Sequence, residues 1–415
     1  MSMDRPLHPA DLVKEIRNAV GESIDLNRDT SDDEIREMIM KTVFARSREN
    51  YLEMEEKLEV IETVFNSMRR LDALQPVMDD RNVTEVMING ADSVFIERDG
   101  RISRLDIRFE SAEKLEDLIQ NIVSRTNRTV NESYPIVDVR LPDGSRVNIV
   151  LKPAAIDGPV MTIRKFPENP MTMEQLTQLG ALTEEAARVL EQLVKARFNI
   201  FISGGTGCGK TTFLNALSGF IPKDERIITI EDSAELRISG VENLVRLETR
   251  NANTEGKGQI TIRDLIRTSL RMRPERIIVG EVRGAEALDM LQAMNTGHDG
   301  SLSTGHANSA ADMLTRLETM VLSGAALPLD AVRRQIASAL DIIVHLSRLR
   351  DKSRRVLEIS EVTGFFDGQI RLNRIFEFTE TGGDRDGKVI GSLKRTGGRF
   401  INTWKLSMAG ISDLY

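Results

Sequence analysis

Residues 204–211 read Gly204-Gly205-Thr206-Gly207-Cys208-Gly209-Lys210-Thr211, which is a complete GxxxxGK[ST] motif. An apolar run precedes it at 198–202, and Thr212 and the helix-forming residues 213–217 follow it, so the motif lies between a strand and a helix. Glycines let successive backbone N–H groups face a phosphate chain, and the helix N-terminus adds its positive dipole end. The sequence therefore predicts a nucleoside triphosphate site over residues 204–212, with Lys210 on the β- and γ-phosphates and Thr211 on Mg²⁺.

Length and composition describe an ordinary globular protein. With 415 residues the chain is too long for a single core, and two or three domains are expected. No run approaches the ~20 apolar residues of a transmembrane helix, and the first residues lack the apolar core of a signal peptide. We therefore expect a cytoplasmic protein whose membrane contact is peripheral.

The net charge and the numbers of cysteines and histidines argue against nucleic-acid coating, an intrachain disulfide and structural zinc. The net charge of −8 argues against a protein that mainly coats nucleic acid. The single cysteine, Cys208, excludes an intrachain disulfide and is expected to be a small residue that fits the glycine loop. Four histidines, two of them at His298 and His306, do not form a dense ligand cluster, so structural zinc is not expected.

The first part of the chain changes character near residue 76. Residues 1–75 are highly charged with helical periodicity, as in Leu12, Ile16 and Val20, and predict a small helical module. Residues 76–166 predict an α+β domain. Its expected elements are strands at 94–98 and 102–107, a helix at 112–124, a hairpin of 136–141 with 146–150, and a strand at 160–166.

The second part predicts a parallel α/β fold. Residues 167–176 are expected to be a proline-bounded linker, although Thr172 and Gln175 form a capping box that starts a helix. From 177 to 415 strands alternate with helices, which indicates a P-loop NTPase domain with a C-terminal extension. The expected parallel strands are 200–203, 227–230, 244–247, 277–279 and 342–346.

Acidic residues end two of these strands. Glu231 and Asp232 follow the strand at 227–230, and Glu281 follows the strand at 277–279. Gly280 occupies the place where a Walker B aspartate usually holds Mg²⁺, so Glu281 is better suited to polarising the attacking water. Either Glu231 or Asp232 is expected to contact hydrated Mg²⁺.

A polar, glycine-rich segment at 296–308 is expected to lie between helices, and a histidine in it could hydrogen-bond a γ-phosphate. The combined motifs resemble the type II/type IV secretion ATPase superfamily, in which the glycine loop is Walker A, 230–232 the Asp box, 279–284 Walker B and 296–309 the His box. The resemblance is greatest to the CpaF-type ATPases of tight adherence (TadA-like) Flp pili, and it covers roughly residues 76–380.

This resemblance implies a RecA-like ATPase domain behind the α+β domain, assembled as a homo-hexamer at the cytoplasmic face of the inner membrane. ATP and Mg²⁺ would be its cofactors, a polytopic membrane platform protein its partner, and pilin its indirect cargo. By position, the family's roles fall on Lys210 and Thr211 as phosphate and Mg²⁺ ligands, Glu281 as catalytic carboxylate, Glu231 as Asp-box acid and His306 as His-box residue. Arginines reaching the γ-phosphate map best to Arg140 and Arg146, and next to Arg250, Arg271 and Arg273.

Four other functions compete with this interpretation. A ring translocase acting on nucleic acid or another polymer is opposed by the acidic charge and by the lack of an aromatic-basic stacking surface. A GTPase lacks its Asn-Lys-x-Asp signal, and a small-molecule kinase would leave the two-domain plan unexplained. An inactive ATP-binding scaffold does not account for Glu281.

Overall fold

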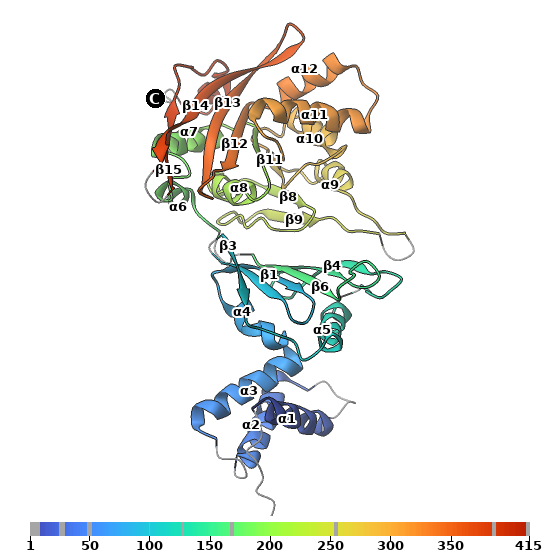
Figure 1. Ribbon diagram of the computed structural model, residues 1–415. Helices are drawn as coiled ribbons and strands as arrows, with labels where there is room; N and C mark the ends of the chain where they lie inside the picture. Colours follow the sequence, from blue (N-terminus) through green and yellow to red (C-terminus); the bar gives the residue numbers. More distant parts are fainter. Residues whose placement is uncertain are drawn as a thin grey trace, which may run out of the picture. The chain divides into compact units, whose positions relative to one another are not determined.

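The computed structural model describes residues 9–24, 30–47, 52–98, 100–126, 128–166, 170–252, 256–383 and 387–411, the side chains of residues 9 and 10 excepted. The chain divides into two compact units, Met1–Pro167 and Glu168–Tyr415 (Figure 1). Residues 167–169 of the expected linker lie outside the described part. Among the described residues, no helix has the length and apolarity needed to cross a bilayer.

The first unit begins with three helices that share a small core. These helices are α1 (Pro9–Ser23), α2 (Asp32–Arg46) and α3 (Met54–Arg69). One apolar stripe from each is buried, for example Ile16, Ile39 and Val64. Ser31 caps α2 and forms a reciprocal capping box with Glu34, which fixes the start of the helix.

An antiparallel sheet with its own core follows in the same unit. Its strand order is β3-β2-β1-β6-β5-β4. Helix α5 packs on it with Leu115, Ile119 and Ile122, and Leu74 and Met78 from the preceding short helices belong to the same core. The elements are η1 (Asp72–Leu74), α4 (Gln75–Asp79), β1 (Val83–Asn89), β2 (Val94–Arg98), β3 (Arg101–Leu105), α5 (Ala112–Ser124), β4 (Ile136–Arg140), β5 (Arg146–Val150) and β6 (Val160–Arg164).

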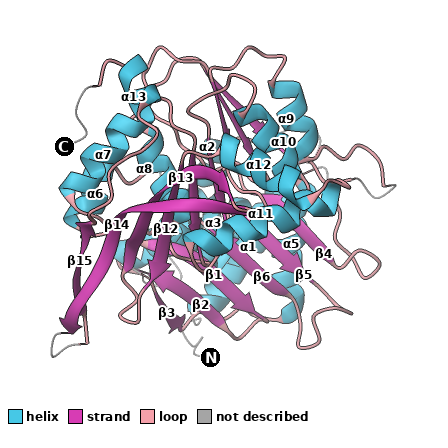
Figure 2. Cartoon of the chain, turned by 90° about the horizontal axis from the view of Figure 1, so that it is seen from above, coloured by secondary structure: helices cyan, strands magenta, loops and turns pink. Residues whose placement is uncertain are grey.

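The second unit is built on a nine-stranded sheet of order β15-β14-β13-β12-β7-β11-β10-β8-β9. The six strands from β12 to β9 are parallel. Beyond β12, the strands β13, β14 and β15 extend the sheet in antiparallel fashion (Figure 2). The strands are β7 (Ile200–Gly204), β8 (Ile227–Glu231), β9 (Leu244–Glu248), β10 (Arg276–Val279), β11 (Leu302–Gly305), β12 (Ile342–Arg348), β13 (Arg354–Phe366), β14 (Gln369–Gly383) and β15 (Val389–Arg395).

Helices cover both faces of this sheet. One apolar cluster lies under α6, α7, α8 and α13, and the other under α9 to α12. Because the central strands are buried on both sides, β7, β8 and β10 are apolar along almost their whole length. The helices are α6 (Met173–Gln178), α7 (Glu184–Lys195), α8 (Lys210–Ser218), α9 (Ile262–Ser269), α10 (Glu286–Met294), α11 (Ala310–Gly324), α12 (Leu329–Ala339) and α13 (Trp404–Met408).

Two details differ from the sequence prediction, while the α/β class is confirmed. Helix α6 starts at Met173, inside the expected linker, because Met173 and Leu176 are buried in the core of the second unit. The predicted capping box of Thr172 and Gln175 begins this helix. The segment 296–308 is not only a connection between helices, since it contains the central strand β11.

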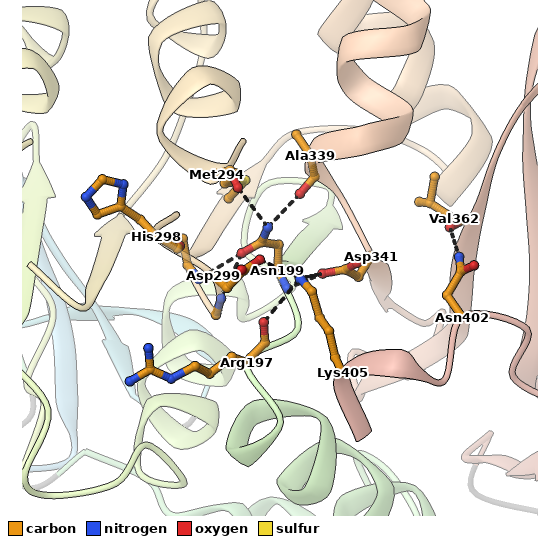
Figure 3. A network of polar contacts seen from close by, with 12 residues as sticks. Arg197, Asn199, Met294, His298, Asp299, Ala339, Asp341, Val362, Asn402 and Lys405 are labelled. Carbon is orange, nitrogen blue, oxygen red and sulfur yellow. Dashed lines mark hydrogen bonds and ion pairs between the residues drawn. The ribbon is translucent and has the colours of Figure 1, made fainter. Parts of the chain in front are cut away.

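A buried polar network closes the amino edge of the parallel strands (Figure 3). Asn199, directly before β7, donates its side-chain N–H to the carbonyl of Ala339 at 2.8 Å. Its Oδ1 accepts the backbone N–H groups of Gly300 and Ser301 at 2.9 and 3.0 Å. One amide side chain therefore joins the entries of β7 and β11 to the end of α12.

The C-terminal helix α13 is fastened to the same edge. The buried ammonium of Lys405 lies 2.7 Å from both Asp299 and Asp341 (Figure 3). Asp341 also accepts the backbone N–H of Asn199 at 2.7 Å. Paired and hydrogen-bonded charges of this kind are tolerated in a protein interior because their polar atoms are satisfied.

We expect Asn199→Ala to lower the free energy of unfolding of the second unit by roughly 3 kcal/mol, because two buried N–H groups and the carbonyls of Ala339 and Met294 each lose a hydrogen bond. Urea denaturation measures this change. Asn251→Ala, at an exposed position, is the matched control and should change stability by less than about 0.5 kcal/mol. Equal urea midpoints for the two variants would contradict the role assigned to Asn199.

Candidate functional site

The glycine loop links the carboxyl end of β7 to the start of α8. Gly207 and Gly209 have φ angles of 70° and 95°, in the left-handed region that favours glycine. Gly205, Thr206 and Gly207 are exposed, and Cys208 is buried beneath the loop, where burial raises the pKa of its thiol. Thr211 and Thr212 stand half-buried in the first turn of α8. The loop thus presents backbone N–H groups and a helix N-terminus together, as anion binding requires.

Lys210 lies folded over the loop from the first position of α8. Its Nζ donates to the carbonyls of Gly204 and Gly205 at 3.1 and 3.0 Å. The same atom is 3.2 Å from Nδ1 of His306. Burial lowers the pKa of this ammonium. Lys210 therefore connects the loop to the neighbouring strand β11.

His306 and Glu281 form the next link. His306 follows β11, and its Nε2 lies 2.7 Å from Oε1 of Glu281, which follows β10. Burial, and then the charge of Lys210, lower the pKa of His306, so the ring is neutral near pH 7. Nδ1 of His306 faces Lys210 and Nε2 faces Glu281, so the ring lies between the ammonium and the carboxylate.

Arg283 holds the other oxygen of Glu281. Its guanidinium donates to Oε2 at 2.8 Å and lies 3.9 Å from Asp232. The hydrogen bond to Glu281 raises the pKa of Arg283. Arg283 is not among the candidates from sequence, although it stands two residues after Glu281 and carries the opposite charge. This spacing of opposite charges is the sequence feature that could have indicated the contact between Arg283 and Glu281.

Glu231 is buried at the carboxyl end of β8. Its Oε1 accepts the backbone N–H groups of Glu235 and Leu236, both at 2.9 Å. Its Oε2 is buried and has no hydrogen-bond partner among the described residues. Burial raises the pKa of this carboxyl group from 4.5 to about 7. Asp232, by contrast, is exposed and lies 3.4 Å from the hydroxyl of Thr249.

The side chain of Glu231 explains the glycine in the Walker B position. A Cβ on Gly280 would lie 2.8 Å from Cγ of Glu231, closer than real Cβ atoms approach. The acid on β8 thus occupies the space that a side chain at 280 would need. Glycine at this position is required by packing.

The donor set fits a hydrated Mg²⁺. No group of three or more His, Cys, Asp or Glu side chains able to hold a metal occurs in the described part of the chain. Mg²⁺ usually keeps several waters and takes only one or two protein ligands. The Thr211 hydroxyl and the unpartnered Oε2 of Glu231 suit such binding.

The structure separates His298 from His306. His298 precedes β11 at the amino edge of the sheet (Figure 3). Its Nδ1 lies 3.2 Å from the carbonyl of Ala293. Arg271 and Arg273 precede β10 at this edge too. The sheet therefore stands between these three residues and the glycine loop of the same chain.

Arg250 lies beyond β9, on the carboxyl edge but four strand positions from β7. At ~4.8 Å per strand this corresponds to about 19 Å. Its Nε donates to the carbonyl of Gly258 at 2.7 Å.

Arg140 and Arg146 belong to the first unit. They face each other across the β4–β5 hairpin, so their side chains leave the same face of the sheet. Arg146 lies 3.4 Å from Asp138. The turn between them is fixed by Gly144, with φ 91°, and by Asp143, which accepts the N–H of Ser145.

Comparison with known proteins gives a consistent result. Residues 69–386 match the family described as type II/IV secretion system protein. The conjugal transfer protein TrbB of Rhizobium radiobacter is 33% identical over 312 residues, which cover 74% of this chain and 93% of that protein. The type IV secretion system protein PtlH of Bordetella pertussis is 34% identical over 316 residues, covering 70% and 93%.

Solved structures agree at the level of the fold. The pilus retraction motor PilT with bound ADP superimposes with a TM-score of 0.52 at 21% identity, covering 72% of this chain and 81% of that chain. The ATPase DotB of Legionella pneumophila gives a TM-score of 0.50 at 23% identity, covering 68% and 78%. The predicted P-loop core behind an α+β domain is confirmed by this likeness.

We expect Glu231→Gln to change how stability depends on pH. The folded pKa of about 7 exceeds the ordinary 4.5, so between these values the folded chain keeps a proton that the unfolded chain has released. Stability conferred by the protonated group is therefore lost as pH rises through this window. Nucleotide-free and Mg²⁺-free Glu231→Gln should exceed wild type by about 3 kcal/mol at pH 8 and match it near pH 4.5.

Urea denaturation at several pH values checks this difference. Glu242→Gln, at an exposed position, should follow the wild-type profile. A constant difference between Glu231→Gln and wild type at all pH values would show that Glu231 does not titrate in this window.

Proposed function

Because the chain belongs to the type II/IV secretion system protein family, we propose that it is an ATPase that drives a type IV (Tad/Flp-like) pilus or a related type II/IV secretion machine. The observation that carries the proposal is the continuous set of contacts from Lys210 through His306 to Glu281. These contacts place a cation, a neutral imidazole and a carboxylate beside one glycine loop. A phosphate-transfer site needs positioned charge more than covalent chemistry.

Each residue has a definite part in the proposed hydrolysis of ATP. Backbone N–H groups of 204–212 and Lys210 bind the β- and γ-phosphates. Glu281, oriented by His306 and Arg283, accepts a hydrogen bond from the attacking water and aligns it with the γ-phosphorus. His306 is placed to sense the γ-phosphate through its contact with Lys210.

Bound Mg²⁺, held by the Thr211 hydroxyl and through water by Glu231, would neutralise charge on the β- and γ-phosphate oxygens. The two backbone N–H groups on Oε1 of Glu231 fix the carboxyl group and leave Oε2 for this role. Asp232, exposed beside Arg283, is less suited to it.

The proposed machine includes a ring of six copies at the cytoplasmic face of the inner membrane, acting on a polytopic platform protein and through it on pilin. The CpaF-like motif set and relatives named for conjugal transfer and type IV secretion support this choice. We expect no nucleic-acid substrate, and ATPase activity independent of DNA would separate this function from that of a ring translocase.

The proposal predicts a split between binding and hydrolysis. Glu281→Gln should bind ATP with near-normal affinity and lose about 10²-fold or more in turnover, because it keeps the side-chain shape but not the charge that polarises water. Lys210→Ala should lose both ATP binding and turnover. ATP hydrolysis and binding of a fluorescent nucleotide measure these effects.

The assay should cover a range of protein concentrations, because a site completed in a ring makes the rate per chain rise with concentration. Exposed Glu242→Gln and Lys223→Ala are the matched controls. Normal turnover in Glu281→Gln would remove Glu281 from the catalytic role.

Arg140 and Arg146 are proposed to reach the γ-phosphate. Replacing either by alanine should lower turnover about 10³-fold and leave ADP affinity almost unchanged, since the contact would be made to the transferred phosphoryl group. Arg101→Ala, on the strand at the opposite edge of the same sheet, controls for loss of surface charge. Undiminished hydrolysis in both variants would make these arginines surface charges of the α+β domain.

A further inference from the structure

An arginine from the antiparallel extension of the sheet touches the glycine loop. Arg354 is the first residue of β13, and its Nε donates to the carbonyl of Gly207 at 2.9 Å. Its Cδ lies 3.4 Å from the position that a Cβ on Gly209 would occupy. Its two terminal nitrogens, Nη1 and Nη2, form no hydrogen bond or ion pair with any residue that the structure describes.

The turn that carries Arg354 is firmly built. Asp351 accepts the N–H and the hydroxyl of Ser353 at 3.0 and 2.6 Å, and it also accepts the N–H of Val389 at 2.8 Å. These hydrogen bonds lower the pKa of Asp351 to about 2. Arg350 forms a bidentate pair with Glu380 on β14. Arg354 therefore extends from a fixed support and not from a free loop.

The strand order indicates which end of a bound nucleotide lies on which side of β7. Strand β7 is flanked by β11 on one side and by β12 on the other. His306 and Glu281 follow β11 and β10, so they mark the γ-phosphate end of the proposed site. A phosphate chain along the loop then has its α-phosphate and nucleoside toward β12 and β13. Arg354 stands on this side.

We propose that Arg354 is a nucleotide-binding residue whose free Nη1 and Nη2 atoms bind the α-phosphate, while its Nε is anchored on Gly207. This assignment rests on the proposed ATPase function and adds a ligand outside the four motifs. A guanidinium without a carboxylate partner, held beside a phosphate-binding loop, presents the fork of N–H donors that suits phosphate oxygens. Its contact is the same in ATP, in ADP and in the transition state.

Three replacements separate this role from simple support of the loop. Arg354→Ala should weaken ADP and ATP binding about tenfold each and raise KM with kcat nearly unchanged, because uniform binding energy is lost. Arg354→Gln keeps an N–H donor for Gly207 but no charge, and it should bind as weakly as the alanine variant. Arg354→Lys keeps the charge and should restore part of the affinity.

ADP binding by calorimetry at two salt concentrations, together with steady-state ATPase kinetics, measures these effects. Lys352→Ala, at an exposed position in the same turn, is the control and should bind ADP as wild type does. Wild-type affinity in Arg354→Gln, or a kcat that falls together with affinity, would show that Arg354 only positions the loop and would overturn the proposal. ADP binding tests Arg354 even if the wild-type chain does not hydrolyse ATP, so the two proposals fail separately.

Discussion

The parallel hydrogen-bond register around β7 is the constraint on which the rest of the site depends. Ser203 pairs with Gly305 of β11, and Gly204 pairs with Leu346 of β12. The loop, His306 and the β12–β13 turn therefore leave the sheet at the same level. Because side chains alternate along a strand, a shift of one residue would turn buried side chains outward and move His306 away from Lys210. Burial of apolar side chains on both faces makes such a shift costly.

The two edges of the parallel strands have opposite polar properties. At the amino edge, Asn199, Asp341 and Lys405 satisfy one another, and their network fixes strand entries and the C-terminal helix. At the carboxyl edge, Oε2 of Glu231 is unpartnered within the described residues, and Lys210 is hydrogen-bonded to carbonyls of its own loop. An unpartnered buried carboxylate oxygen costs stability, and it is an atom that a cation can bind.

The sequence alone predicted the elements whose signal is local. The predicted bounds of β7, β8, β9 and β10 agree with the structure within one residue at each end. Apolar runs mark these strands, the glycine loop marks the end of β7, and acidic residues mark the ends of β8 and β10. Strand β11 was missed because Leu302-Ser303-Thr304-Gly305 contains only one large apolar residue. Thr304 is accommodated by a hydrogen bond to the carbonyl of Gly280, a contact formed only when the sheet assembles. Arg354 lies 147 positions from Gly207 and no local pattern indicates their contact.

The acidic side chain at this site comes from Glu231 on β8 and not from position 280 after β10, and this has a chemical consequence. Gly280 leaves no carboxylate on β10 at the usual place, and Glu231 on β8 fills that space from the side. A carboxyl group with a pKa of about 7 is partly protonated near neutral pH. A cation beside Oε2 would lower that pKa, so cation binding at this position would release a proton. Burial makes Glu231 costly to ionise in the free chain. The carboxyl group is therefore expected to become fully ionised when a cation binds beside it.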